Sequence, residues 1–185
     1  MKRWIVLCVA LVGLWSALRA QEPTQPPVPA HGSTVIVLRH AEKDAQGDPK
    51  DPGLAAAGRT RAEALARLLA PGKPTRLFAS EFQRAQRTLD PLAQALGLKV
   101  EVEPAGKGAE LAQTLRALPE GSVSVVVGHS NSVPALVAAL GGKIERLEKG
   151  SLAETEFGRL FVLTLPPEGS AGRVATSTLE LSYGN

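Results

Sequence analysis

The stretch Thr34-Val-Ile-Val-Leu38-Arg39-His40 decides the fold that this sequence predicts. Its first five residues form a continuous run rich in β-branched side chains, which is typical of a strand buried on both faces of a sheet. An arginine and a histidine follow at once, where such a strand would end. Because ligands of parallel α/β sheets bind at the carboxyl ends of the strands, this stretch predicts chemistry at that edge.

Helical and strand patterns alternate along the rest of the chain. Apolar residues recur at helical spacing in four segments, which predicts helices over 55–69, 81–96, 109–118 and 133–140. Shorter apolar or alternating runs predict strands over 34–38, 76–79, 99–102, 123–127, 157–165 and 174–183. This order favours an α/β fold with a mostly parallel sheet and helices on both faces, a three-layer sandwich.

The beginning of the chain differs from the remainder. Lys2 and Arg3 precede an apolar run over 5–18, and Ala20 precedes a stretch rich in proline, which is the layout of a secretory signal peptide. We therefore expect a signal peptide over 1–20, a Pro-rich linker over 21–32 and one domain over 33–185. This predicts a periplasmic or secreted protein without stable membrane insertion after leader removal. The alternative is a leader retained as an anchor.

Charge and cysteine content narrow the class of protein. Three of the 21 basic residues (Lys2, Arg3 and Arg19) lie in the predicted leader, so 18 basic and 18 acidic residues remain in the rest of the 185-residue chain. A balanced charge gives no reason to expect a nucleic-acid partner. The only cysteine, Cys8, also lies in the leader, so the predicted domain forms neither a disulfide nor a cysteine metal site.

Two further predicted strands also end in polar side chains. Ser80 follows the strand at 76–79, with Arg84 one turn into the next helix, and Gly128-His129-Ser130-Asn131 follows the strand at 123–127. Two guanidinium groups offer planar forks that match phosphate oxygens, and a neutral imidazole can attack phosphorus. Together these side chains predict a phosphate pocket that needs no metal ion and no cofactor.

Three motifs in this order resemble those of the histidine phosphatase superfamily, which has the phosphoglycerate-mutase-like fold. Val37-Leu38-Arg39-His40-Ala41-Glu42 is similar to its first motif, 79–88 to its second and Val127-Gly128-His129-Ser130 to its third. Leu54-Ala-Ala-Ala-Gly58 is similar to the segment that precedes the first long helix of the family. The resemblance covers about residues 33–165 and suggests a small exported member.

The resemblance implies a role for each matching residue. His40 would attack phosphorus and form a phosphohistidine, which water would then hydrolyse. Arg39, Arg84 and His129 would bind the phosphoryl oxygens and offset the charge of the transition state. Ser130 and Asn131, beside His129, are expected to contact the substrate.

The acid that protonates the leaving group is left open. Members with the phytase pattern place an aspartate where this chain has Asn131. Glu42, two residues after His40, is our first candidate, and Glu103, Glu110 and Glu154 are the others. Phe82 is expected in the core. The charged stretch 143–156 is expected to form a solvated rim, with contact to the substrate as the alternative.

Three functions therefore compete. The first is a phosphomonoesterase acting on a phosphorylated small molecule, an envelope sugar or a phosphoprotein. The second is a phosphate-binding module that has lost its acid and does not turn over. The third is a phosphomutase, which would need to exclude water from its intermediate.

Overall fold

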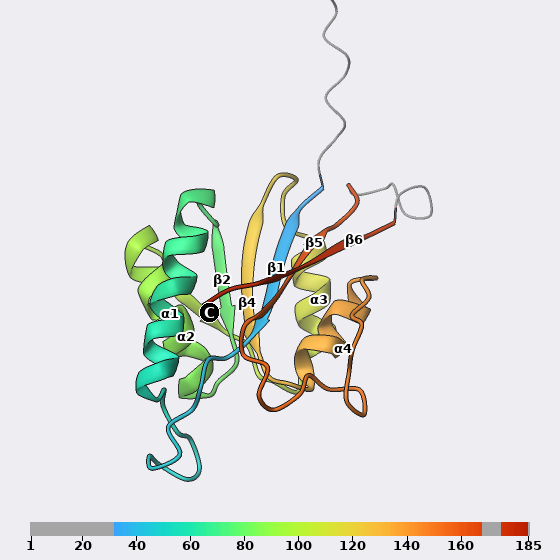
Figure 1. The fold of residues 1–185 in the computed structure, drawn as a ribbon. Helices are drawn as coiled ribbons and strands as arrows, with labels where there is room; N and C mark the ends of the chain where they lie inside the picture. Colours follow the sequence, from blue (N-terminus) through green and yellow to red (C-terminus); the bar gives the residue numbers. More distant parts are fainter. Residues whose placement is uncertain (1–31, 168–174, 185) are drawn as a thin grey trace, which may run out of the picture.

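One mixed sheet runs through residues 32–167 and 175–184, which this computed structural model describes (Figure 1). Its six strands are β1 (Thr34–Arg39), β2 (Arg76–Ala79), β3 (Val100–Val102), β4 (Val123–Gly128), β5 (Arg159–Thr164) and β6 (Ser177–Ser182). The helices are α1 (Ala56–Leu69), α2 (Gln83–Leu96), α3 (Gly108–Arg116) and α4 (Ser132–Ala139), with a 3-10 turn η1 (Ala70–Gly72) after α1.

The strands lie in the order β3-β2-β4-β1-β5-β6. The first four of these pair in parallel, whereas β5 pairs antiparallel with β1 and β6 pairs antiparallel with β5. Arg39 at the end of β1 stands opposite Gly128 at the end of β4, so the residues that follow the two strands leave the sheet side by side. The predicted fold class, a mostly parallel α/β sheet of the phosphoglycerate-mutase-like fold, is confirmed.

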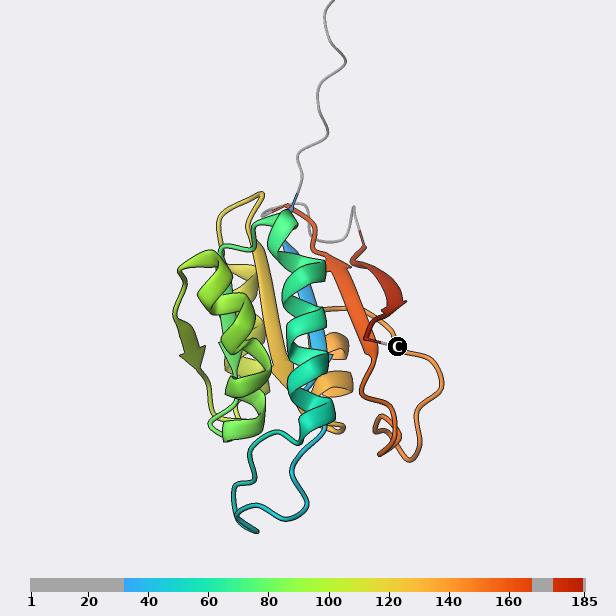
Figure 2. The same cartoon turned by 60° about the vertical axis from the view of Figure 1, so that its left-hand side comes forward.

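Helices cover both faces of the sheet, as predicted. In Figure 1 and Figure 2, α1 and α2 lie against one face and α3 and α4 against the other. Successive residues of β1 alternate between the two cores: Val35 and Val37 pack with residues of α3 and α4, and Ile36 and Leu38 with residues of α1 and α2. Burial on both faces explains why this strand reads as an unbroken apolar run.

Element boundaries agree with the predicted ones to within three residues. Helix α2 begins at Gln83 rather than Glu81, because Phe82 has extended backbone angles (φ −76°, ψ 137°). Strand β5 begins at Arg159 rather than Phe157. The structure does not describe the predicted leader or the predicted linker, apart from Gly32. Val174, the first residue of the last predicted strand, also lies outside the described residues.

None of the helices in the part of the chain described here is long and apolar enough to cross a membrane.

Candidate active site

A hollow of about 340 Å³ opens at the carboxyl ends of β1, β2 and β4. We call it the central hollow, and its lining residues are Arg39, His40, Lys43, Phe82, Arg84, Ala105, His129, Ser130, Asn131 and Glu154. The structure thus brings together the proposed nucleophile and all five residues that were predicted to bind substrate. Glu42, the first candidate for the acid, does not line the central hollow, whereas Glu154 does.

His40 is buried, and its two ring nitrogens have different partners. The Ala41 carbonyl oxygen lies 2.8 Å from Nδ1, and since a carbonyl only accepts, Nδ1 carries the proton. Nε2 accepts a hydrogen bond from Nε of Arg84 at 3.2 Å. Burial, together with the charges of nearby Arg39 and Arg84, lowers the pKa of His40 to about 4. At neutral pH the ring is therefore uncharged and Nε2 keeps its lone pair.

His129 lies across from His40, with the ring centroids 5.2 Å apart. Its Nδ1 faces Nη2 of Arg84 at 3.4 Å, and its Nε2 is 2.8 Å from the Ser80 hydroxyl oxygen. Because arginine only donates, Nδ1 is the acceptor and Nε2 donates to Ser80. Burial and the charge of Arg84 lower the pKa of His129 to about 4, so this ring is also neutral when the hollow holds no anion.

Arg84 stands between the two imidazoles. Its guanidinium lies 4.4 Å from the ring centroid of Phe82 and 3.8 Å from a carboxylate oxygen of Asp51. The carboxylate of Asp51 also accepts from the backbone N–H of Gln83 at the start of α2. The prediction of Phe82 as a core residue is wrong, because its ring is half-buried and supports Arg84 at the rim of the hollow. Asp51 was missed because it lies in an irregular loop.

Arg39 is almost completely buried, with 3% of its surface exposed. Its Nη1 donates to the carbonyl oxygens of Ala153 (2.9 Å) and Glu154 (3.0 Å), and its Nη2 donates to the Glu154 carboxylate (2.8 Å). The Phe157 ring centroid lies 4.4 Å from the guanidinium carbon. The Nε–H group is buried without an acceptor. A buried donor of this kind is costly unless an acceptor reaches it, and a phosphoryl oxygen is one that fits.

The hydroxyl of Thr88 joins the first two motifs. It accepts from the backbone N–H of Ala41 at 3.0 Å and donates to the carbonyl oxygen of Arg84 at 2.7 Å. Thr88 is fully buried on α2, so it links the backbone beside His40 to the helix that carries Arg84. A threonine at this position therefore fixes the relative placement of the two side chains.

The candidate acids are all in poor positions to donate a proton at neutral pH. Burial raises the pKa of Glu42, but the hydrogen bonds and charge of Arg61, a backbone hydrogen bond and the charge of Arg39 together outweigh burial and hold that pKa below its usual value. The charge of Arg39 lowers the pKa of Glu154. Glu103 lines a separate, largely apolar pocket between the sheet and α3, and Glu110 is exposed on α3.

The stretch 143–156 is more than a solvated rim. Leu152 is buried in the core below α4, its N–H donates to the carbonyl oxygen of Ser130 at 2.9 Å, and the next two residues hold Arg39. That expectation is therefore corrected, since charge patterning alone gave no sign of these contacts. Among the described residues, no group of three or more His, Cys, Asp or Glu side chains is placed to hold a metal ion.

Comparison with known proteins agrees with this geometry. Residues 35–107 match the histidine phosphatase superfamily (branch 1). This match includes Arg39, His40 and Arg84 and ends before His129, which the fold brings to the same hollow. No curated protein matches the chain.

Two solved structures give the extent of the shared fold. The protein histidine phosphatase SixA, solved with tungstate, is 24% identical with a TM-score of 0.61, over 80% of this chain and 96% of its own. A mycobacterial glucosyl-3-phosphoglycerate phosphatase is 17% identical with a TM-score of 0.58, over 80% of this chain and 97% of its own. At these identities, the likeness concerns the fold.

Proposed function

We propose that this chain is a metal-independent phosphatase that acts through a phosphohistidine at His40. The observation that carries the proposal is the neutral imidazole of His40, whose unprotonated Nε2 faces Arg84 inside a hollow lined by cationic side chains. A neutral ring nitrogen is the form that attacks phosphorus. Arg39 and Arg84 supply positive charge where the transferring phosphoryl group gains negative charge.

The reaction would run in two steps. In the first, the lone pair on His40 Nε2 forms a bond to phosphorus while the bond to the leaving group breaks with its electron pair. In the second, water attacks phosphorus, the bond to Nε2 breaks, and inorganic phosphate is released. A dianion bound beside His129 opposes the charge of Arg84 and so favours protonation of that ring, which would then donate to a phosphoryl oxygen.

The substrate that suits this hollow has a leaving group that departs without help from an acid. Both Glu42 and Glu154 are paired with arginine, and their pKa values are lowered, so neither carboxyl group is protonated at neutral pH. Phosphoramidates such as phosphohistidine, and aryl phosphates, meet this requirement, whereas alkyl and sugar phosphates meet it poorly. The name of the SixA structure, a protein histidine phosphatase, supports phosphohistidine as the substrate, whereas the name of the mycobacterial glucosyl-3-phosphoglycerate phosphatase would favour a sugar phosphate.

Release of phosphate from a phosphohistidine peptide, 4-nitrophenyl phosphate and glucose phosphate, each measured with chelator present, tests the proposal. We expect turnover of the first two substrates, a slower reaction with the third, and loss of activity by more than about a thousandfold in His40→Asn, which lacks the attacking nitrogen. His31→Asn, in the predicted linker, is the matched control and should act like the wild type. Full activity in His40→Asn would exclude the nucleophile assignment.

The same assay separates the alternatives. A binding module that has lost its acid would bind orthovanadate without turning over any substrate, and the ion-paired state of Glu42 and Glu154 is the observation in its favour. A mutase would move phosphate within one substrate and release little of it. Export remains part of the proposal, and the amino-terminal residue of the mature protein, determined after secretion, tests it.

A further inference from the structure

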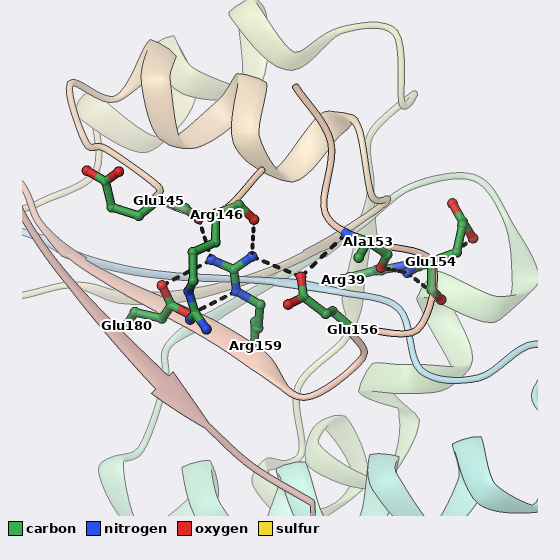
Figure 3. Close-up of polar contacts among 8 residues, drawn as sticks. All are labelled: Arg39, Glu145, Arg146, Ala153, Glu154, Glu156, Arg159 and Glu180. Atoms are coloured by element: carbon green, nitrogen blue, oxygen red, sulfur yellow. Dashed lines mark hydrogen bonds and ion pairs between the residues drawn. The ribbon is translucent and has the colours of Figure 1, made fainter. Parts of the chain in front are cut away.

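Arg159 is a buried cation whose hydrogen bonds are all satisfied, and it lies outside the central hollow. It is 7% exposed and stands at the first position of β5. Its five N–H donors bond to both carboxylate oxygens of Glu180, to the carboxylate of Glu156 and to the backbone carbonyls of Glu145 and Arg146, at 2.7–3.2 Å (Figure 3). This one side chain therefore ties several points of the preceding loop to the sheet.

We define the segment 141–158, between α4 and β5, as the anchor loop. A turn near its carboxyl end holds Arg39: Nη1 donates to the carbonyl oxygens of Ala153 and Glu154, and Nη2 donates to the Glu154 carboxylate (Figure 3). The Nε–H and the second Nη2 proton of Arg39 are the donors that remain. The backbone of the anchor loop thus decides which edge of the guanidinium is left for an anion.

Glu156 connects Arg159 to the turn that holds Arg39. One oxygen of its carboxylate, Oε2, accepts from Nη1 of Arg159 at 3.0 Å and from the backbone N–H of Ala153 at 3.4 Å. Only the Cα of Ala153 separates that N–H from a carbonyl that holds Arg39. A short chain of contacts therefore runs from Glu180 on β6 through Arg159 and Glu156 to the guanidinium in the central hollow.

We propose that Arg159 is a positioning residue for phosphoryl transfer: through Glu156 and the turn at 153–154, it holds Arg39 in the orientation that binds the phosphoryl group. This inference rests on the proposed function. Loss of Arg159 would leave Glu156 and the carbonyl groups of Glu145 and Arg146 without their hydrogen-bond donor. Arg39 would then sample orientations that fit phosphate poorly. A misplacement of about 1 Å at a reacting centre costs on the order of a hundredfold in rate.

A double-mutant cycle distinguishes positioning from general stabilisation. We expect Arg159→Met to lower kcat/KM for 4-nitrophenyl phosphate by about ten- to a hundredfold in the wild-type background. In an Arg39→Lys background no planar guanidinium remains at position 39 to be oriented. There, Arg159→Met should lower kcat/KM by less than about twofold. Orthovanadate affinity, measured in all four proteins, should show the same dependence.

Arg76→Met is the control. Arg76 begins β2 at the amino end of the strand and pairs with Glu101 on the edge strand β3, so its loss should lower thermal stability without changing kcat/KM. If Arg159→Met does not fold, Glu156→Gln tests the same link, because it keeps the size of the side chain and removes its charge. Equal effects of Arg159→Met, or of this substitute, in both backgrounds overturn the inference.

The experiment also separates this inference from the proposed function. If the wild type binds orthovanadate but turns over no substrate, the proposed function fails, and the coupling in vanadate affinity still decides the role of Arg159. If the wild type turns over substrate and no coupling is found, the inference alone fails. A wild type that neither binds vanadate nor releases phosphate overturns both.

Discussion

Two buried imidazoles and two arginines share the central hollow, and burial together with the arginine charges sets the protonation state of each ring. Both His40 and His129 have pKa values lowered to about 4, first by burial and then by the positive neighbours. The resting hollow therefore carries positive charge on its guanidinium groups and lone pairs on its imidazoles. This division suits the capture of an anion followed by attack on it.

A titration of the imidazoles tests this charge state. Because the folded pKa lies below the ordinary value of 6.5, each ring should stay neutral from pH 7 down to about 5 and gain its proton near pH 4. NMR signals of the imidazole carbons, assigned with His40→Asn and His129→Asn, report this directly. Midpoints near 6.5 for both rings would contradict the structure. Orthovanadate bound in the hollow should move the His129 midpoint upward.

The Glu154 carboxylate competes with any anion for Arg39. In Glu154→Gln the competing charge is gone, so phosphate and orthovanadate should bind about two- to fivefold tighter. This gain in anion affinity should become smaller as salt is added, because 77% of the Glu154 side chain is exposed and its charge is screened by ions. Inhibition constants at low and high salt measure it. Glu63→Gln, which breaks an exposed pair on α1, is the control. Weaker binding in Glu154→Gln would show that its charge supports the site.

At the scale of elements, hydrophobic patterning predicted the six strands and four helices of the described residues. Most of them bury one or two apolar faces in the two cores, whereas β6 shows the alternating pattern but leaves Leu179 and Leu181 exposed. The site followed for a related reason: parallel strands deliver their carboxyl ends to one edge, so polar residues after 39, 79 and 128 had to meet.

The contacts of irregular segments could not be predicted in this way. Glu42 was favoured as the acid for its nearness to His40 in the chain, yet it pairs with Arg61, while Arg59 and Arg67 on the same helix were equally available by sequence. Glu154 lines the hollow, and Asp51 contacts Arg84, from loops that show no periodicity. Their positions depend on contacts between residues far apart in the chain, such as those of Leu152 with Ser130 and of Asp51 with Gln83.

The close approach of α1 to the backbone after β1 depends on Gly58. A Cβ at this position would lie 2.3 Å from the Glu42 carbonyl oxygen, so Gly58→Ala must push the helix and the 40–42 segment apart. We expect a loss of about 1–3 kcal/mol in the free energy of unfolding, measured by urea denaturation, together with a lower kcat/KM. Gly72→Ala, which meets no atom within 4 Å, is the control and should change stability by less than about 0.5 kcal/mol.

For the molecule as a whole, the two neutral histidines make stability depend on pH. Their pKa values are about 4 in the folded protein, against an ordinary value of 6.5, so the unfolded chain binds protons first as the pH falls. Stability that is present above pH 6.5 is therefore lost between 6.5 and about 4, by roughly 3 kcal/mol for each ring. Urea denaturation at pH 7, 6 and 5 measures the slope.

The stability of the double variant His40→Asn/His129→Asn should change little between pH 7 and 5. Carboxylates such as those of Glu42 and Glu180, whose pKa values are lowered from 4.5, lose their stabilising effect mainly as the pH falls below about 4.5. An unchanged slope in the double variant would assign the acid sensitivity to other groups.

The strand order has a consequence for synthesis. Of the six described strands β1 leaves the ribosome first, but its two neighbours, β4 and β5, end at Gly128 and Thr164. The apolar strand that precedes the proposed nucleophile therefore stays unpaired until β4 and β5 have been synthesised. Sheets that depend on pairing between strands far apart in the chain fold slowly and pass through aggregation-prone intermediates. A nascent chain stalled near residue 110 would already contain His40 and still lack both strands that hold it in place.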